Sequence, residues 1–352
     1  MVKNIYENLT KLKEHLGIKP INTGQQLHYG GIVSDDIEAL HATGSVNGDC
    51  VYLRSGVEFN LFEYRGQTQE YGTCLSTLDR IQDDHKLFSA LCRSIYFKQA
   101  LTTHPAIMRM QDLVLDLDAR TQPLPVCINL EGIAQHYGLA TEYLDITNNF
   151  SIASFFATQS WNSKTKKFEP MCAQSKPGVI YRLNSILLMD SAVGRDEEPY
   201  VFVGWQPFPR PEQQRANAIR LQPREDFLKL GSMIPYYFRH SRNQSKRIYE
   251  EFEGGDKLMP ADELADFADI LQTKTSFPQS TLDQAFQSYG LRRKAQDTPD
   301  KRASLMAKAG ITLEERDSFK TQVWNFNQEA FDAEVQQMLS RVRTRMAFFL
   351  PS

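Results

Sequence analysis

Segments with the period of an amphipathic helix alternate along the chain with segments patterned like β-strands, and this alternation constrains the fold more than any other feature. Apolar side chains recur with a helical period over residues 5–16, before Gly17, and over most of residues 76–120. Strand-like runs bounded by Pro, Gly and charged residues follow later, at 179–183, 200–205, 217–221 and 232–238. A chain that interleaves both patterns is neither all-α nor all-β. We therefore expect an α+β fold whose later strands lie together.

The middle of the chain contains two junctions at which a loop leads into a helix. A strand over 57–65 is expected to end at a turn containing Gly66. Residues 129–138 and 149–161 are expected to be helices, because each begins with an asparagine that can cap the first turn. Residues 141–147, between the two helices, read as extended. The two junctions therefore lie close together in the sequence.

Both ends of the chain are expected to be accessory to this centre. Residues 20–50 are rich in glycine and predict loops, with at most a short helix at 37–41. The polar stretch 292–302 reads as a linker. Beyond it, an apolar stripe over 331–349 predicts a long amphipathic helix that must be buried, either on the chain's own domain or on a second copy. We favour the second copy and hence a homo-oligomer.

Composition and charge exclude several classes of protein. With 352 residues and 41% hydrophobic side chains, the chain is typical of a folded globular protein. Its 40 Lys and Arg against 43 Asp and Glu provide no overall positive field for nucleic acid or an anionic membrane. No apolar run approaches the roughly 20 residues of a membrane span. We expect a cytoplasmic protein without a membrane partner.

The cysteine and histidine residues predict neither a disulfide framework nor a metal site. The five cysteines are odd in number and show no C-x-x-C spacing, so we expect reduced thiols. No H-x-x-x-H or similar spacing is found among the seven histidines, so no metal is predicted.

Two motifs stand out in the middle of the chain. Residues 62–67 read FEYRGQ, which resembles the motif that gives the FRG domain family its name. Residues 134–147 read AQHYGLATEYLDIT and are followed by ASFFA at 153–157, similar to the family's Q-H-Y-G-L-x-T-x-L-L-D-W-T and the helix after it. Residues 75–80 resemble the S-x-L-x-R continuation of the first motif. A third block, from Arg210 through Gln214, matches more weakly.

The resemblance implies a division of the chain into four parts. The FRG domain would occupy residues 55–275, preceded by an N-terminal helical and loop extension over 1–54. A linker over 276–302 would then lead to a C-terminal helical segment over 303–352.

The order of the motifs is similar to the Arg, Ser-Thr-Ser and Glu order of arginine-type ADP-ribosyltransferases. This analogy implies a mixed, mostly antiparallel sheet core of that type with flanking helices and a C-terminal helical extension, and NAD as the cofactor. An Arg fork such as that of Arg65 can hold a pyrophosphate, and the Thr147 hydroxyl can orient the ring or ribose. Tyr64, Gly66 and Tyr137 would complete the cofactor site.

The catalytic residues implied by the analogy are Arg65, His136, Asp145 and Gln214. Gln214 stands where those transferases carry a Glu, and a neutral amide is a poor stabiliser of the positive charge that develops as nicotinamide leaves. Glu212 and Asp145 are the candidate carboxylates instead. His136 could carry a proton or stack on a nucleobase.

Each of these residues also has a structural explanation. Arg65 could pair with a carboxylate such as Asp145, His136 could be a satisfied core histidine, and Thr147 could cap the following helix. Tyr64 and Tyr137 could be core side chains.

Three functions follow from the residues and the resemblance. The first is an ADP-ribosyltransferase-like or NAD-glycohydrolase effector, a toxin of bacterial anti-phage or conflict defence, whose target protein or RNA the sequence does not reveal. The second is a non-catalytic FRG module that binds a nucleotide or a macromolecule in the same cleft. The third is an assembly role for the C-terminal helix.

Overall fold

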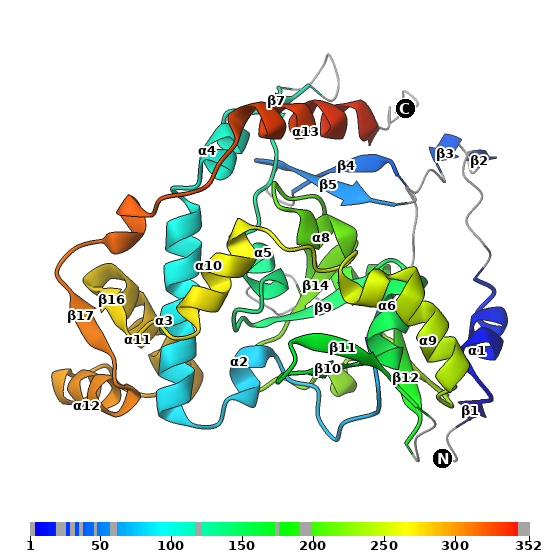
Figure 1. Cartoon of the computed structure of the whole chain (residues 1–352), viewed down its shortest axis with the longest axis horizontal. Helices are drawn as coiled ribbons and strands as arrows, with labels where there is room; N and C mark the ends of the chain where they lie inside the picture. The colour runs from blue at the N-terminus through cyan, green and yellow to red at the C-terminus, as the bar shows by residue number, and fades with distance from the viewer. Residues whose placement is uncertain are drawn as a thin grey trace.

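The computed structural model describes residues 4–18, 26–28, 32–34, 38–45, 48–56, 62–116, 122–172, 176–190 and 199–343. Its centre is a seven-stranded sheet (Figure 1). The strand order is β1 (Ile5–Tyr6), β15 (Met233–Phe238), β12 (Gly178–Asn184), β6 (Phe62–Gln67), β9 (Tyr143–Thr147), β14 (Ala216–Arg220) and β13 (Tyr200–Phe202). Neighbours are antiparallel, apart from the parallel pair of β1 and β15. The expected α+β class with a mostly antiparallel sheet is confirmed.

Helix α6 (Phe150–Thr158) packs against β6, β9 and β12 and shares an apolar core with α1 (Leu9–His15) and α9 (Arg242–Glu251). The close packing of α6 on β6 requires Gly66, because a Cβ at that position would lie 1.8 Å from the carbonyl oxygen of Ala153. The glycine of the Arg-Gly pair is therefore explained by contact between helix and strand. The assignment of Gly66 to the cofactor site stays a prediction beside this packing role.

A second and larger apolar core surrounds helix α3 (Asp84–Leu101), beside the sheet in Figure 1. Around α3 pack α5 (Leu130–His136), α10 (Glu263–Leu271), α11 (Gln279–Arg293) and α12 (Pro299–Ala309). The Asn129 side chain caps α5 and the Asn149 side chain caps α6, as the sequence predicted. Helix α6 ends at Thr158 rather than at 161, because β10 (Gln159–Asn162) turns back to pair with β11 (Lys167–Pro170).

The remaining elements are short. They are α2 (Thr77–Arg80), α4 (Pro105–Gln111), α7 (Ser185–Asp190), α8 (Pro209–Gln213), three 3₁₀ turns at 227–229, 253–255 and 318–321, and the paired strands β7 (Val114–Leu115) with β8 (Leu124–Pro125) and β16 (Ser276–Pro278) with β17 (Thr312–Glu314).

The loops expected over 20–50 contain strands instead. β2 (Gln26–His28) pairs with β3 (Ile32–Ser34), and β4 (Leu40–Gly44) pairs with β5 (Val51–Ser55). The short helix expected at 37–41 is not found in its described part, because Leu40 begins β4, which also pairs with β18 (Val342–Arg343) near the other end of the chain. Residues 40–43 of β4 read LHAT and do alternate apolar with polar side chains, so a strand signal was present within this glycine-rich stretch. Ile5 belongs to β1, and the first helix begins only at Leu9.

The segment expected to be a linker, 276–302, is part of the larger core. Phe286 of α11 stacks on Phe88 of α3 with ring centroids 4.5 Å apart. Arg292 is 8% exposed and donates to Asp79 at 3.0 Å and to Glu142 at 3.1 Å. The run of basic residues reads as solvated in sequence because the partners of Arg292 lie 213 and 150 residues away. They come close only in the folded chain.

The C-terminal helix α13 (Gln328–Arg341) packs on its own chain. Phe331 and Met338 are buried in the larger core, and Val335 and Leu339 pack against it. The end of the predicted stripe, Met346 and Phe349, lies outside the described residues. The described part of the stripe therefore has an intramolecular partner and does not need the second copy that we favoured. In the described ranges, no helix combines the length and the apolar character that crossing a membrane requires.

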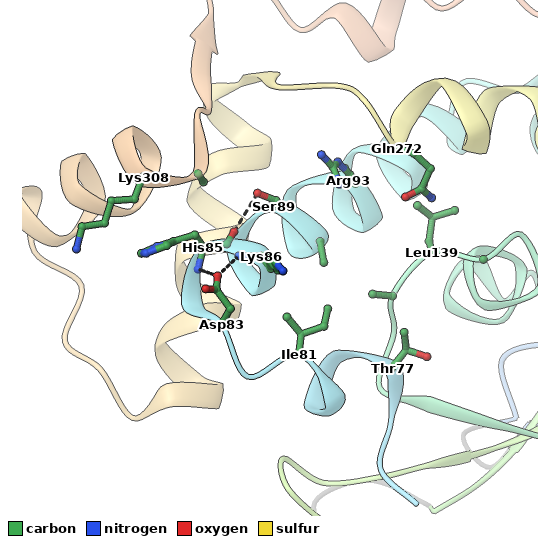
Figure 2. A pocket seen from close by; sticks show the side chains of 14 residues that line it. Thr77, Ile81, Asp83, His85, Lys86, Ser89, Arg93, Leu139, Gln272 and Lys308 are labelled. Carbon is green, nitrogen blue, oxygen red and sulfur yellow. Dashed lines mark hydrogen bonds between the residues drawn. The ribbon is translucent and has the colours of Figure 1, made fainter. Parts of the chain in front are cut away.

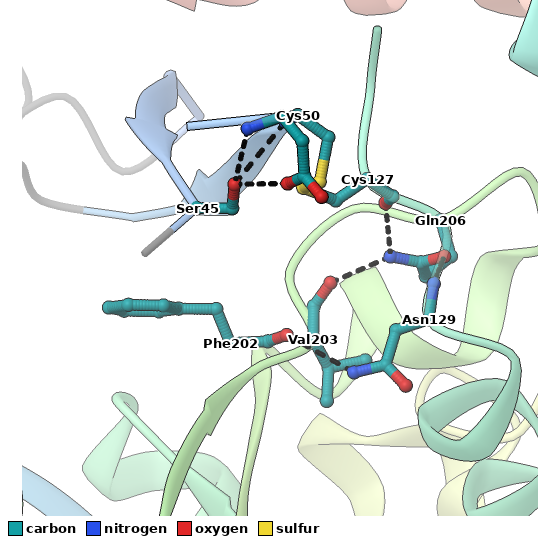
Figure 3. The surroundings of a disulfide bond; sticks show 8 residues. Ser45, Cys50, Cys127, Asn129, Phe202, Val203 and Gln206 are labelled. Carbon is teal, nitrogen blue, oxygen red and sulfur yellow. Dashed lines mark hydrogen bonds between the residues drawn. A yellow bond between two sulfur atoms is a disulfide. The ribbon is translucent and has the colours of Figure 1, made fainter. Parts of the chain in front are cut away.

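A disulfide joins Cys50 to Cys127 across 77 residues, which corrects the expectation that all five cysteines are reduced (Figure 3). The chain brings the two together because Val51 and Val126 form a parallel bridge and the Cys127 N–H donates to the Val51 carbonyl at 2.8 Å. The segment after Cys127 leads into α5 through Asn129, whose N–H donates to Gln206 Oε1. The disulfide thus ties β5 to the start of the helix that carries His136.

Arg292 provides a test of the corrected architecture. We expect Arg292→Ala to lower the free energy of unfolding by about 3 kcal/mol, because it leaves Asp79 and Glu142 as poorly paired carboxylates. Urea unfolding measures the change. The control is Arg302→Ala, whose ion pairs with Asp283 and Asp297 are largely exposed and should contribute less than about 1 kcal/mol. Equal, small effects of the two variants would return 292–302 to the status of a linker.

A buried carboxyl group lies within the sheet. Glu63 of β6 is fully buried, and its Oε1 accepts from the Tyr200 hydroxyl at 2.8 Å and from Asn217 Nδ2 at 3.1 Å. Its Oε2 has no hydrogen-bond partner among the described residues. Burial raises the pKa of Glu63 to about 7, although both hydrogen bonds and the nearby Arg54 act in the opposite direction. The side chain therefore keeps its proton in the folded state under conditions in which the unfolded chain loses it.

We expect this carboxyl group to make the protein less stable as the pH rises. Between an unfolded pKa of 4.5 and a folded pKa of about 7, only the unfolded state releases the proton, so the free energy of unfolding falls by about 3 kcal/mol. Glu63→Gln is neutral at every pH and should remove that part of the slope. Urea unfolding at pH 5 and pH 8 checks this, and an unchanged slope in the variant would show that Glu63 is not its source.

Candidate functional site

The candidate site lies between β6 and β9. All residues of both strands are described by the structure, and the strands pair at a single position, Tyr64 with Thr147. Beyond that pair the Arg65 side chain reaches from one strand to the other, and its Nη1 donates to the main-chain carbonyl of Asp145 at 2.6 Å. Arg65 Nε is buried and has no hydrogen-bond partner among the described residues. The structure thus places Arg65 beside Asp145, bound to its carbonyl rather than to its carboxylate, and leaves one donor unsatisfied.

The two oxygens of the Asp145 carboxylate differ, because Oδ2 accepts a hydrogen bond and Oδ1 is buried without one among the described residues. Gln135 Nε2 donates to Oδ2 at 3.0 Å, and His136 Nε2 lies 3.9 Å from Oδ1. Gln135 is itself fixed, because the Thr141 hydroxyl donates to its Oε1. The Asp145 side chain is 40% exposed. A partly exposed acid supported by two neighbours can act on a ligand, which is the requirement for a base or a charge stabiliser.

His136 is buried, and its hydrogen bonds define its tautomer. Gln214 Nε2 donates to the Leu258 carbonyl at 3.0 Å, so the acceptor Gln214 Oε1 faces His136 Nδ1 at 3.0 Å. Nδ1 must then carry the proton. Nε2, which has no hydrogen-bond partner among the described residues, is directed toward Asp145. His136 Nε2 is therefore placed beside the Asp145 carboxyl group, where it could take part in proton transfer.

Thr147 and Gln214 connect the elements around the site. The Thr147 hydroxyl donates to the Gln214 carbonyl at 2.8 Å and accepts from the Asn149 N–H at 3.2 Å. Both side chains are buried, at 6% exposure each. The structure brings Gln214 to His136, as the motif order implied, but both groups are engaged within the protein. Their geometry suits a supporting role rather than direct contact with a cofactor.

The two candidate aromatic residues belong to the core. Tyr64 makes an edge contact with Phe150, and burial raises its pKa to about 12. The Tyr137 hydroxyl donates to Asp262, and the Arg210 guanidinium lies 4.6 Å from the centre of the Tyr137 ring. Burial and the Asp262 charge raise the pKa of Tyr137. Both rings pack against the protein's own side chains, which gives each a role in the core, and their assignment to a cofactor site stays a prediction.

Glu212, the other candidate carboxylate, points elsewhere. It forms an ion pair with Arg341 and so anchors α13. Asp145 is therefore the better candidate of the two.

A second guanidinium, which the sequence reasoning did not single out, lies near Arg65. Arg80 ends helix α2, and desolvation together with the charge of Arg65 lowers its pKa. Its Nη2 donates to Thr77 Oγ1 at 2.9 Å. The charge of Asp145 acts on the pKa of Arg80 in the opposite direction, so the two guanidiniums and this carboxyl group belong to one cluster of charges. Arg80 and Gln135 both fall in motif positions quoted for the family, and that was the signal that could have identified them.

The comparisons with known proteins agree with the motifs. The FRG domain model matches residues 60–166, a range that includes Arg65, Arg80, Gln135, His136, Asp145 and Thr147. No curated protein and no solved structure matches the chain. Gln214, which lies outside the matched range, joins the same hydrogen-bond network through His136. The chain therefore contains an FRG domain at residues 60–166, and the two motifs of that domain meet at Arg65 and Asp145.

Proposed function

We propose that the FRG domain binds NAD at the gap between β6 and β9 and cleaves the bond between nicotinamide and ribose. The observation that carries the proposal is the Arg65 guanidinium bound to the Asp145 carbonyl, beside the partly exposed Asp145 side chain, with the charge of Arg80 acting in the same cluster. Arginine forks hold pyrophosphate bidentately.

The role of each residue follows from the charge that the reaction develops. Nicotinamide leaves NAD as a neutral molecule, so its departure needs no general acid, but the ribose carbon becomes positively charged. A carboxylate beside that carbon stabilises the transition state. Asp145 takes this role in place of the buried, neutral Gln214. The proton of the attacking water or acceptor then passes to Asp145, with His136 Nε2 behind it.

The wider role that we propose is that of an effector of bacterial anti-phage or conflict defence, acting in the cytoplasm on NAD or on a protein or RNA target. It rests on the family resemblance and on this site. The Cys50–Cys127 disulfide argues against a reducing compartment, where disulfides seldom persist, and so stands against the cytoplasmic part of this proposal. Expression of the parent chain should lower the cell's NAD content. Expression of Asp145→Asn in its place should leave the NAD content unchanged.

Two substitutions separate binding from chemistry. We expect Arg65→Gln to weaken NAD binding at least tenfold, because a charged contact to phosphate is lost. Asp145→Asn should bind NAD and release nicotinamide at least a hundredfold more slowly, because it lacks the stabilising charge. Calorimetry measures binding and mass spectrometry measures nicotinamide. Arg109→Gln and Asp332→Asn, which break an exposed ion pair elsewhere, are the matched controls.

The same experiment distinguishes the alternative function. A parent protein that binds NAD through Arg65 but releases no nicotinamide would be a non-catalytic nucleotide-binding module. NAD binding that is the same in Arg65→Gln and in Arg109→Gln would contradict the site itself.

A further inference from the structure

A cavity of about 650 Å³ lies outside the Arg65–Asp145 site (Figure 2). Its walls come from α2 and the loop after it, from the first three turns of α3, from residues 138–140 after α5, and from the end of α12. A cavity of this volume is within the range that holds a nucleotide-sized ligand. Nothing in the proposed NAD chemistry uses it.

Three cations line this cavity. Lys86 and Arg93 come from α3 and Lys308 from α12, and none of the three has a carboxylate within 4 Å in the part of the chain that the structure describes. Figure 2 shows Lys308 near one end of the cavity and Arg93 toward the other. The positive charge is therefore distributed along the cavity instead of being concentrated at one point.

The acidic residue of the lining offsets part of this charge. Asp83 Oδ1 accepts from the N–H groups of His85 and Lys86 and so caps α3, and these bonds together with the charges of His85 and Lys86 lower its pKa. Three cations against one carboxylate still leave the cavity with an excess of positive charge.

Arg93 is the most informative of the three cations because it is half-buried. Its Nε donates a long hydrogen bond, 3.4 Å, to the Lys274 carbonyl. Burial lowers the pKa of Arg93, which reflects a guanidinium partly withdrawn from water without a compensating charge. Such a group is unfavourable in an empty cavity and favourable beside an anion.

The rest of the lining is mixed, with the polar side chains of Thr77, His85, Ser89 and Gln272 beside several apolar ones. Ile81, Ala90 and Leu139 contribute side chains that offer a surface to an uncharged ring or sugar. We propose that this cavity binds a phosphorylated small molecule of the nucleoside polyphosphate class, with its phosphates on Lys86, Arg93 and Lys308. This site goes beyond the proposed NAD site and does not depend on it.

Calorimetry with ATP, inorganic triphosphate and adenosine, without divalent metal, tests the proposal on the full chain. We expect ATP to bind, with affinity falling as salt is raised, and the double variant Lys86→Gln, Lys308→Gln to bind at least tenfold more weakly. The control double variant is Lys246→Gln, Lys320→Gln, which removes the same charge from exposed lysines on other elements. Triphosphate binding as tightly as ATP would assign the site to the phosphates alone, and adenosine should not bind.

The outcome is independent of the first site. Arg65→Gln should bind ATP at this cavity as the parent does, and the Lys86, Lys308 variant should keep its NAD turnover. Failure of both ATP and triphosphate to bind, or equal binding by the two double variants, overturns the proposal. Thermal unfolding of each variant confirms that it is folded, and Arg93→Gln provides a further substitution if the double variant is not.

Discussion

The buried guanidinium of Arg292 holds together the two elements that frame the candidate site. It donates to Asp79, in helix α2, and to Glu142, directly before β9. One residue after Asp79 comes Arg80, and three residues after Glu142 comes Asp145. Because Glu142 also pairs with Arg220 of β14, the same cluster connects the helical half of the molecule to the sheet. The positions of Arg80, proposed to bind an anion, and of the Asp145 carboxylate thus depend on Arg292, which lies outside the matched FRG range.

The sequence predicted the elements whose signals are local. The asparagine caps at Asn129 and Asn149 and the strand at 178–184 are examples. A helix cap or a run of strand-forming residues can be recognised from neighbouring positions in the sequence. It did not predict the pairing of β4 with β18 or the Cys50–Cys127 disulfide. It misread Arg292 for the same reason. Each of these depends on a contact between distant parts of the chain.

The site shows the same division. The motif order correctly placed Arg65, His136, Asp145 and Gln214 in one connected group. It could not tell which side chains would face a ligand. Thr147 pairs with Tyr64 across the strands, and its hydroxyl is used by the Gln214 carbonyl and the Asn149 N–H. Tyr137 is likewise used by Asp262 and Arg210. A hydroxyl in a motif is free for function only if the fold leaves it unused.

Helix α2 lies between the candidate NAD site and the basic cavity. Thr77 lines the cavity and accepts a hydrogen bond from Arg80, whose pKa is lowered by desolvation and by the charge of Arg65. The Leu78 N–H donates to the Thr141 carbonyl, and Thr141 fixes Gln135, which holds Asp145. Within the helix, the Ser76 hydroxyl donates to Asp79, the partner of Arg292. A four-residue helix is too short to be stable by its own backbone hydrogen bonds. Its position is therefore set by these contacts, and the ion pair with Arg292 fixes the wall that the two sites share.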